Sequence, residues 1–182
     1  MKINVGCGSK RLPGYVNVDI NPAYGPDYAC HADRLGFCGD GQAEEILLEA
    51  VYEHLYLTER PRALAEWRRC LCSGGRLVIN WLPDAEAAAM RLSRHIRGEC
   101  GADCGTRDEF PHFNLEVFER FACAPPQTHH ELAYNVHKGL FTREVVRQEL
   151  EAAGFHIASI EGRTYPGEHG SPVNLCIEAV KV

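Results

Sequence analysis

Residues 2–8 read KINVGCG and residues 15–19 read YVNVD, and these two stretches decide the fold class. The first has a β-branched residue at every second position and then Gly6 and Gly8, which predicts a strand that runs into a tight loop. The second predicts another strand, ending at Asp19. Backbone N–H groups of a Gly-x-Gly turn allow close approach of a ligand, and an acid after the next strand can accept hydrogen bonds from a ribose diol. The pattern therefore indicates a nucleoside site.

The rest of the chain predicts alternating strands and helices. Strands are expected at residues 28–30, 45–48, 76–82, 155–160 and 174–182. Helices are expected from an N-cap at Thr58 to the Gly74-Gly75 pair, from a cap at Asp84, and from Thr142 to Gly154, with Leu64, Trp67, Val145, Val146 and Leu150 inward. Such alternation predicts an α/β protein with a parallel sheet covered on both faces. The last two strands have no helix between them, so we expect them to pair antiparallel.

Composition places the chain among ordinary globular domains and excludes some partners. It has 182 residues, which suits a single domain over residues 1–182, and a formal net charge of -6. That charge disfavours bulk nucleic acid and anionic membranes as partners. The sequence contains no run of 18 apolar residues, so no membrane span is predicted. The nine cysteines occur without a signal-peptide core, so we expect reduced thiols and a cytoplasmic location.

The opening glycines depart from the dinucleotide-binding fingerprint. That fingerprint needs a third glycine, where this chain has Arg11, and an acid about 20 residues further on. Here Asp19 comes only 11 residues after Gly8. A site for the pyrophosphate of a nicotinamide cofactor is therefore disfavoured, and a nicotinamide-dependent oxidoreductase remains a minor alternative.

Five pieces of the sequence, in order along most of the chain, resemble the class I S-adenosylmethionine-dependent methyltransferases. The resemblance is strongest to small predicted methyltransferases with a shortened first loop. The pieces are residues 5–8, 14–19, 51–55, 66–77, and the segment containing 137–138, 141–142 and 153–155. The resemblance implies a Rossmann-like, doubly wound, mainly parallel seven-stranded sheet with an antiparallel C-terminal strand.

The resemblance also implies site residues and S-adenosylmethionine as the cofactor. Gly6, Cys7 and Gly8 would contact the cofactor through the backbone, Asp19 would bind the ribose, Asp33 would lie near the adenine with a backbone N–H from Arg34 or Leu35, and Glu49 and Ala50 would line the methionine end. This chain departs from the family in three places. Only about ten residues join the first two strands, Glu44 replaces an aspartate, and no N-terminal helix is expected to cover the cofactor, so a homodimer could complete the pocket.

Histidines are the candidate general bases, because methyl transfer needs a base only where the nucleophile loses a proton. His54 comes first, since it follows the fourth strand; His112 and His137 lie in or beside a lid or insertion expected over residues 85–140. His54 could instead only bond a backbone carbonyl. A zinc site of His95, Cys100, Cys104 and His112 is a less favoured alternative, and we expect no metal.

These features predict a methyltransferase that acts on a small-molecule or sugar-linked acceptor, such as a glycan precursor. The alternative from another class is a module that binds S-adenosylmethionine and transfers nothing. The acceptor is not specified by any recognisable pattern, because the segment expected to bind it, residues 85–140, has none.

Overall fold

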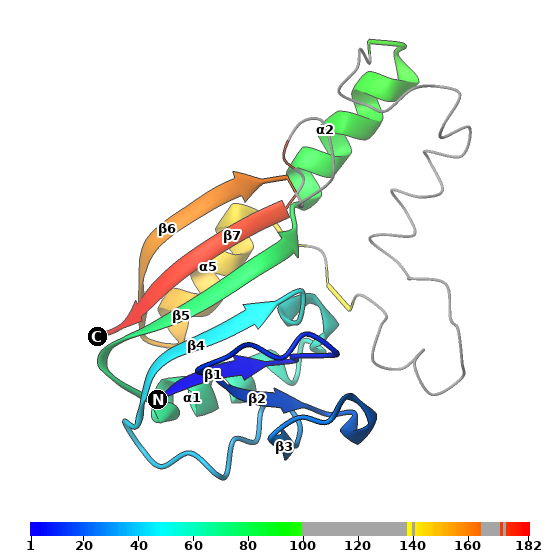
Figure 1. Cartoon of the computed structure of the whole chain (residues 1–182). Helices are drawn as coiled ribbons and strands as arrows, with labels where there is room; N and C mark the ends of the chain where they lie inside the picture. The colour runs from blue at the N-terminus through cyan, green and yellow to red at the C-terminus, as the bar shows by residue number, and fades with distance from the viewer. Residues whose placement is uncertain (100–137, 140, 165–171, 173) are drawn as a thin grey trace.

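The computed structural model describes residues 1–99, 138–139, 141–164, 172 and 174–182 (Figure 1). Seven strands form one sheet in the order β3-β2-β1-β4-β5-β7-β6. The strands are β1 (Lys2–Val5), β2 (Val16–Asp19), β3 (Tyr28–Ala29), β4 (Ala43–Glu49), β5 (Leu71–Pro83), β6 (Phe155–Arg163) and β7 (Asn174–Lys181). The helices are α1 (Arg60–Cys70), α2 (Ala85–Ile96) and α5 (Arg143–Ala152), with short 3-10 turns η1 (Pro22–Tyr24) and η2 (Tyr52–His54).

The sheet is parallel except at β7. β1 pairs in parallel with β2 on one side and β4 on the other, and β7 lies antiparallel between β5 and β6. This confirms the expected doubly wound sheet with an antiparallel C-terminal strand. The strand order reverses at β1, and Figure 1 shows β1, β2 and β4 pointing the same way. In such sheets a crevice opens beyond the carboxyl ends of the strands where the order reverses.

The core is built from strand positions on both faces of the sheet and from one face of each packed helix. Trp67 and Leu64 of α1 and Val146 and Leu150 of α5 are buried, as the apolar spacing predicts. Val145 is 37% exposed, so its expected inward position is wrong. It lies next to Val146 on the helix, and a turn of about 100° per residue leaves room for only one of the two against the sheet.

The boundaries of α1 differ from the prediction at both ends. Thr58 does not cap the helix: Glu59 holds the N-cap position without a side-chain hydrogen bond. Gly74 and Gly75 do not stop it either, because α1 ends at Cys70 and β5 already begins at Leu71, which pairs with Ala43 of β4. Sheet pairing therefore decides this boundary.

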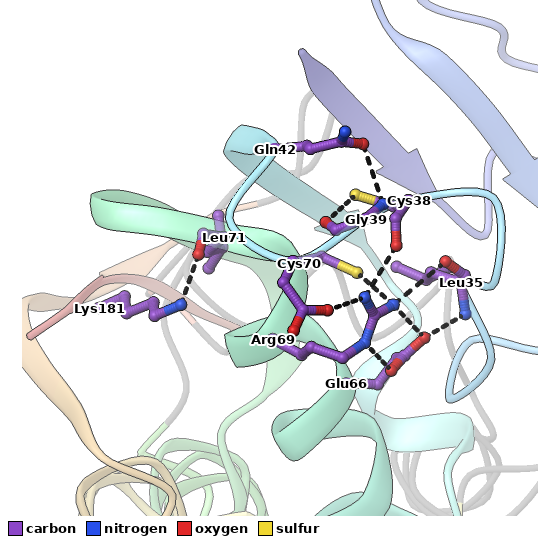
Figure 2. Close-up of polar contacts among 10 residues, drawn as sticks. Leu35, Cys38, Gly39, Gln42, Glu66, Arg69, Cys70, Leu71 and Lys181 are labelled. Carbon is purple, nitrogen blue, oxygen red and sulfur yellow. Dashed lines mark hydrogen bonds and ion pairs between the residues drawn. The ribbon is translucent and has the colours of Figure 1, made fainter.

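Arg69 and Glu66 of α1 hold the loop between β3 and β4 (Figure 2). Arg69 Nε donates to Glu66 Oε2 at 2.8 Å, and Arg69 Nη1 donates to the backbone oxygen of Cys38 at 2.8 Å. The Leu35 N–H donates to Glu66 Oε1 at 2.8 Å. The hydrogen bond from Arg69 lowers the pKa of Glu66, so the carboxylate stays charged. The loop, which has no helix of its own, is fixed to α1 in this way.

The other predicted caps and turns are present. Asp84 Oδ1 accepts the N–H groups of Glu86 and Ala87 at 3.0 and 3.2 Å, and Thr142 Oγ1 accepts that of Val145 at 3.1 Å. Gly154 follows α5 with φ 83°, as a C′ glycine should. Of the expected lid, residues 85–96 form α2, and residues 100–137 lie outside the described residues. Among the described helices, none has both the length and the apolar character for a membrane crossing.

Candidate functional site

A cavity of about 660 Å³ opens beyond the carboxyl ends of β1, β2 and β4, where the strand order reverses. Three groups of residues surround it. The lining consists of Val5, Gly6, Gly8 and residues 19–22 and 24 on the side of β1 and β2, Cys30, His31 and Ala32 after β3, and Ala50, Val51, residues 54–56, Glu59 and Lys138 on the side of β4. The sequence-predicted residues Gly6, Gly8, Asp19, Ala50 and His54 therefore come together at one cavity.

The two glycines of the first turn have different structural reasons to be glycine. Gly6 has φ 69°, and a Cβ there would lie 2.4 Å from Cγ2 of Val51. Gly8 has φ 51°, and a Cβ there would meet nothing within 4 Å, because the residue faces open space at the cavity. Cys7 lies between them, buried, and its N–H donates to the Val18 oxygen at 2.9 Å. Cys7 does not line the cavity; it fastens the turn to β2.

Asp19 is held by two backbone N–H groups at the end of β2. Its Oδ2 accepts from Gly8 and its Oδ1 accepts from Asn21, both at 2.8 Å, and the residue is 8% exposed. A carboxylate has about four acceptor positions, so each oxygen keeps capacity for a further hydrogen bond. Asp19 lines the cavity and can therefore accept two hydroxyl donors from a bound molecule.

Asp33 and Arg34 do not line the cavity. The Asp33 carboxylate accepts hydrogen bonds from Nδ1 of His31 at 2.7 Å and from Nε of Arg62 at 3.1 Å. Burial by itself would raise the pKa of Asp33, but the hydrogen bonds from Arg62 and His31 outweigh it and hold that pKa below its usual range. The side chain of Arg34 is 81% exposed. From this segment Cys30, His31 and Ala32 line the cavity, and the sequence analysis did not single out His31.

Ala50 and Glu49 follow β4 and differ in their relation to the cavity. Ala50 lines it, with φ 54°, and its N–H donates to the Asn80 oxygen at 3.0 Å. A left-handed backbone is uncommon for alanine, and such conformations gather at functional sites. Glu49 lies outside the lining and accepts a hydrogen bond from Nζ of Lys10 at 3.0 Å.

His54 and Lys138 form the far wall of the cavity. The side chain of His54 is 24% exposed. Nζ of Lys138 donates to the backbone oxygen of His54 at 2.8 Å and lies 4.2 Å from the ring centroid of Tyr56. Burial lowers the pKa of Lys138. The sequence showed Lys138 only as part of a resembling segment, because its place beside His54 results from a contact between residues 84 positions apart.

The structure does not describe most of the remaining candidates from the sequence. His112 and His137 lie outside the described residues, as do Cys100 and Cys104 of the zinc alternative. Within the part of the chain that the structure describes, no three His, Cys, Asp or Glu side chains gather to hold a metal ion.

Solved structures share this architecture. The chain superposes on an S-adenosylmethionine-dependent methyltransferase from Methanosarcina mazei with a TM-score of 0.66 and 18% identity, over 100% of this chain and 92% of that one. The chain has the fold of class I S-adenosylmethionine-dependent methyltransferases. No protein-family profile matches the sequence, and no curated protein sequence does.

Two further structures with the methyltransferase fold were solved with S-adenosylhomocysteine bound. One is 1,6-didemethyltoxoflavin-N1-methyltransferase from Burkholderia thailandensis, at TM-score 0.58 and 16% identity, over 100% of this chain and 70% of that one. The other is magnesium protoporphyrin IX methyltransferase from Synechocystis, at TM-score 0.56 and 14% identity, over 100% and 74%. At these identities the likeness concerns the methyltransferase fold itself.

Proposed function

We propose that the protein binds S-adenosylmethionine in this cavity and transfers its methyl group to a small-molecule acceptor. The observation that carries the proposal is Asp19, whose carboxylate is fixed by Gly8 and Asn21 at the cavity wall, directly after the second strand of the sheet. A ribose presents two neighbouring hydroxyl donors, which suits a carboxylate held in one orientation. The named activities of the structures with the same fold support the same reading.

The residues around Asp19 fit the rest of such a cofactor. A cavity of about 660 Å³ is of the size that holds a small ligand. Ile20 and Ala32 offer apolar contact to a base, and Asp33 would act there by orienting His31. The Gly6–Gly8 turn would contact the cofactor through the backbone, and Ala50 would line its methionine end, as the resemblance implies. The cavity would thus offer a carboxylate to the sugar and backbone groups to the methionine end.

The chemistry asks little of the protein beyond position. Bound S-adenosylmethionine supplies a methyl group on a sulfonium, and the neutral thioether leaves without an acid. The cavity would align the acceptor at about 3–3.5 Å from the methyl carbon and exclude water. A base is needed only if the acceptor atom must lose a proton. Of the two histidines that line the cavity, His31 is bonded to Asp33 and His54, which follows β4, is the candidate base.

Calorimetry with defined ligands tests the proposal. S-adenosylmethionine and S-adenosylhomocysteine should bind the wild-type protein, and NAD should not. Asp19→Asn should weaken both by roughly 10- to 100-fold, because a hydrogen bond to a charged group contributes about 1.5–3 kcal/mol. Asp40→Asn is the matched control, since that side chain is 83% exposed and bonds only Arg69 among its described contacts. Equal affinity in wild type and Asp19→Asn contradicts the site assignment.

Transfer itself is tested separately from binding. We expect labelled methyl from S-adenosylmethionine to appear in an acceptor when the protein is incubated with a panel of hydroxyl and amine compounds, sugar-linked ones included. Binding without transfer to any compound of the panel would instead favour a non-catalytic binding module.

A further inference from the structure

Glu53 is a buried carboxyl group next to a cavity residue, His54, and the proposed function does not use it. It is the middle residue of η2, between β4 and α1, and it is 1% exposed. Its Oε2 has no hydrogen-bond partner among the described residues. Placing a carboxyl group in a protein interior with an oxygen left unsatisfied costs free energy, so its presence beside a cavity residue calls for a reason.

The surrounding elements prevent Glu53 from turning into water. On one side, Tyr52 donates its hydroxyl to Oε2 of Glu149 at 2.6 Å, and Arg60 donates to Oε1 of the same carboxylate at 2.7 Å. On the other, the backbone N–H of Lys138 donates to the backbone oxygen of Glu53 at 2.7 Å. The turn is therefore tied to α5, to α1 and to residue 138, and the carboxyl group stays inside.

The group that faces Glu53 is His54. Nε2 of His54 lies 4.0 Å from Oε1 of Glu53, and His54 lines the cavity while Glu53 does not. An imidazole at the wall is thus backed by a carboxyl group that no cavity ligand can contact directly. Once the Glu53 carboxyl is ionised, the two groups can carry opposite charges, and at this distance such charges interact strongly where water is excluded.

We propose that Glu53 and His54 form a proton-accepting pair, in which His54 takes the proton of the methyl acceptor and Glu53 positions and stabilises the resulting imidazolium. This rests on the proposed function. The acceptor atom forms its bond to the methyl carbon, the carbon–sulfur bond breaks with its electron pair on sulfur, and the acceptor proton moves to the His54 imidazole. The sulfonium charge is lost as the imidazolium charge appears, so charge balances.

The pair indicates the class of acceptor. A base beside the cavity is useful only when the attacking atom carries a proton that must leave, as in a hydroxyl group. An acceptor that attacks through an atom without a proton, such as a thioether sulfur, would have no use for the pair. A protic acceptor, with a hydroxyl as the simplest case, is therefore the expected substrate class.

Charged groups around the pair, among the described residues, include those of Arg60, Glu149, Lys138 and Glu59. Burial raises the pKa of Glu53 to about 8, close to the range in which histidine titrates. Arg60 and Glu149 neutralise each other, and the Lys138 ammonium contacts the His54 backbone oxygen, on the same side as Glu59. Because the two groups interact, their protons should be lost in two steps that belong to the pair rather than to either residue.

Imidazole NMR titration tests the pair without a known acceptor. We expect the His54 ring resonances of the full-length protein, assigned by their loss in His54→Asn, to show two inflections, one of them near the Glu53 pKa of about 8. Glu53→Gln keeps the shape of the side chain and should leave a single inflection. Glu151→Gln, with a side chain 53% exposed on α5, is the matched control and should leave both.

The outcomes separate this inference from the proposed function. A single His54 inflection in wild type, or two inflections that persist in Glu53→Gln, overturns the pair. Should Glu53→Gln not fold, the ¹³C titration of the Glu53 carboxyl in wild type and His54→Asn replaces it: a midpoint that moves supports the pair, and an unmoved one overturns it. Calorimetry with S-adenosylhomocysteine reports on the cofactor site alone. If the NMR titration shows coupling but S-adenosylhomocysteine does not bind, the proposed function is contradicted and the coupling of Glu53 and His54 still stands.

Discussion

Gly6 and Gly8, the two glycines of the first turn, differ in what surrounds them. Gly6 and Gly8 both have positive φ, but only Gly6 is pressed against a neighbour, Val51. A Cβ at Gly8 would meet nothing within 4 Å, and Gly8 is among the residues that line the cavity. Glycine is therefore required by packing at position 6, and in the proposed function it leaves room for a ligand at position 8.

Alanine substitutions should separate these two roles. Gly6→Ala should lower the free energy of unfolding by about 2–4 kcal/mol, because the methyl group overlaps Val51 and the backbone is left-handed. Gly8→Ala should cost only about 1–2 kcal/mol of stability but weaken S-adenosylhomocysteine binding. Gly14→Ala, also at positive φ with nothing near and outside the cavity, is the control. Chemical denaturation and calorimetry measure both effects, and equal binding by the Gly8 and Gly14 variants would contradict the assignment.

Glu53 should make the stability of the protein depend on pH. Its pKa rises from an ordinary 4.5 to about 8 on folding, so between these values the folded chain holds a proton that the unfolded chain has lost. The contribution of Glu53 to stability therefore falls as pH rises through this window, by about 1.4 kcal/mol for each pH unit at most. Relative to wild type, Glu53→Gln should gain stability from pH 5 to 8. Thermal unfolding of both proteins across this range measures the difference, which a constant offset would contradict.

At the scale of elements, one carboxylate joins three pieces of the chain. Glu149 of α5 accepts hydrogen bonds from Tyr52 of η2 and from Arg60 at the start of α1. The side chain of Arg60 is only 7% exposed, and its guanidinium also lies 4.7 Å from the ring centroid of Phe141. The position of η2, and with it the far wall of the cavity, depends on this buried junction.

Removing Glu149 should therefore destabilise the protein more than removing its neighbour on the same helix. Glu149→Ala leaves Arg60 buried without its carboxylate partner, and we expect a loss of about 2–4 kcal/mol in the free energy of unfolding. Glu151→Ala removes a half-exposed carboxylate and should change stability by less than about 0.5 kcal/mol. Denaturant unfolding compares the two, and similar losses would argue against a structural junction at Glu149.

At the scale of the whole molecule, the central strands of the sheet are paired on both sides, and one edge strand is very short. β1, β4, β5 and β7 lie between other strands, whereas β3 is a two-residue edge strand with both residues exposed. The cavity takes part of its wall from the residues that follow β3. The proposed cofactor site thus lies beside the two-residue edge strand of the sheet.

Hydrogen exchange should reveal this gradient. Amides of β4 and β5 should exchange only through global unfolding, and the Cys30 N–H, bonded to Asp19, through local opening. We expect S-adenosylhomocysteine to slow exchange after β3 far more than in β7. Peptide-resolved exchange with and without the ligand measures this, and uniform slowing across the sheet would contradict a site at the β3 edge.

How far the sequence specifies the molecule follows from the range of the interactions involved. The strand over Lys2–Val5, the turn at Gly6 and the acid at Asp19 depend on neighbouring residues, so they could be predicted, and with them the sheet and the carboxylate at the cavity wall. The caps at Asp84 and Thr142 are equally local.

Only the tertiary structure placed the remaining parts of the site. It assigned the Asp33 carboxylate to Arg62, put His31 in the cavity, set Lys138 against His54 and buried Glu53. It also moved the end of α1 to Cys70, because Leu71 pairs with Ala43. Each of these rests on contacts between segments distant in the sequence, and no local pattern encodes which distant group will satisfy a given donor, acceptor or strand edge.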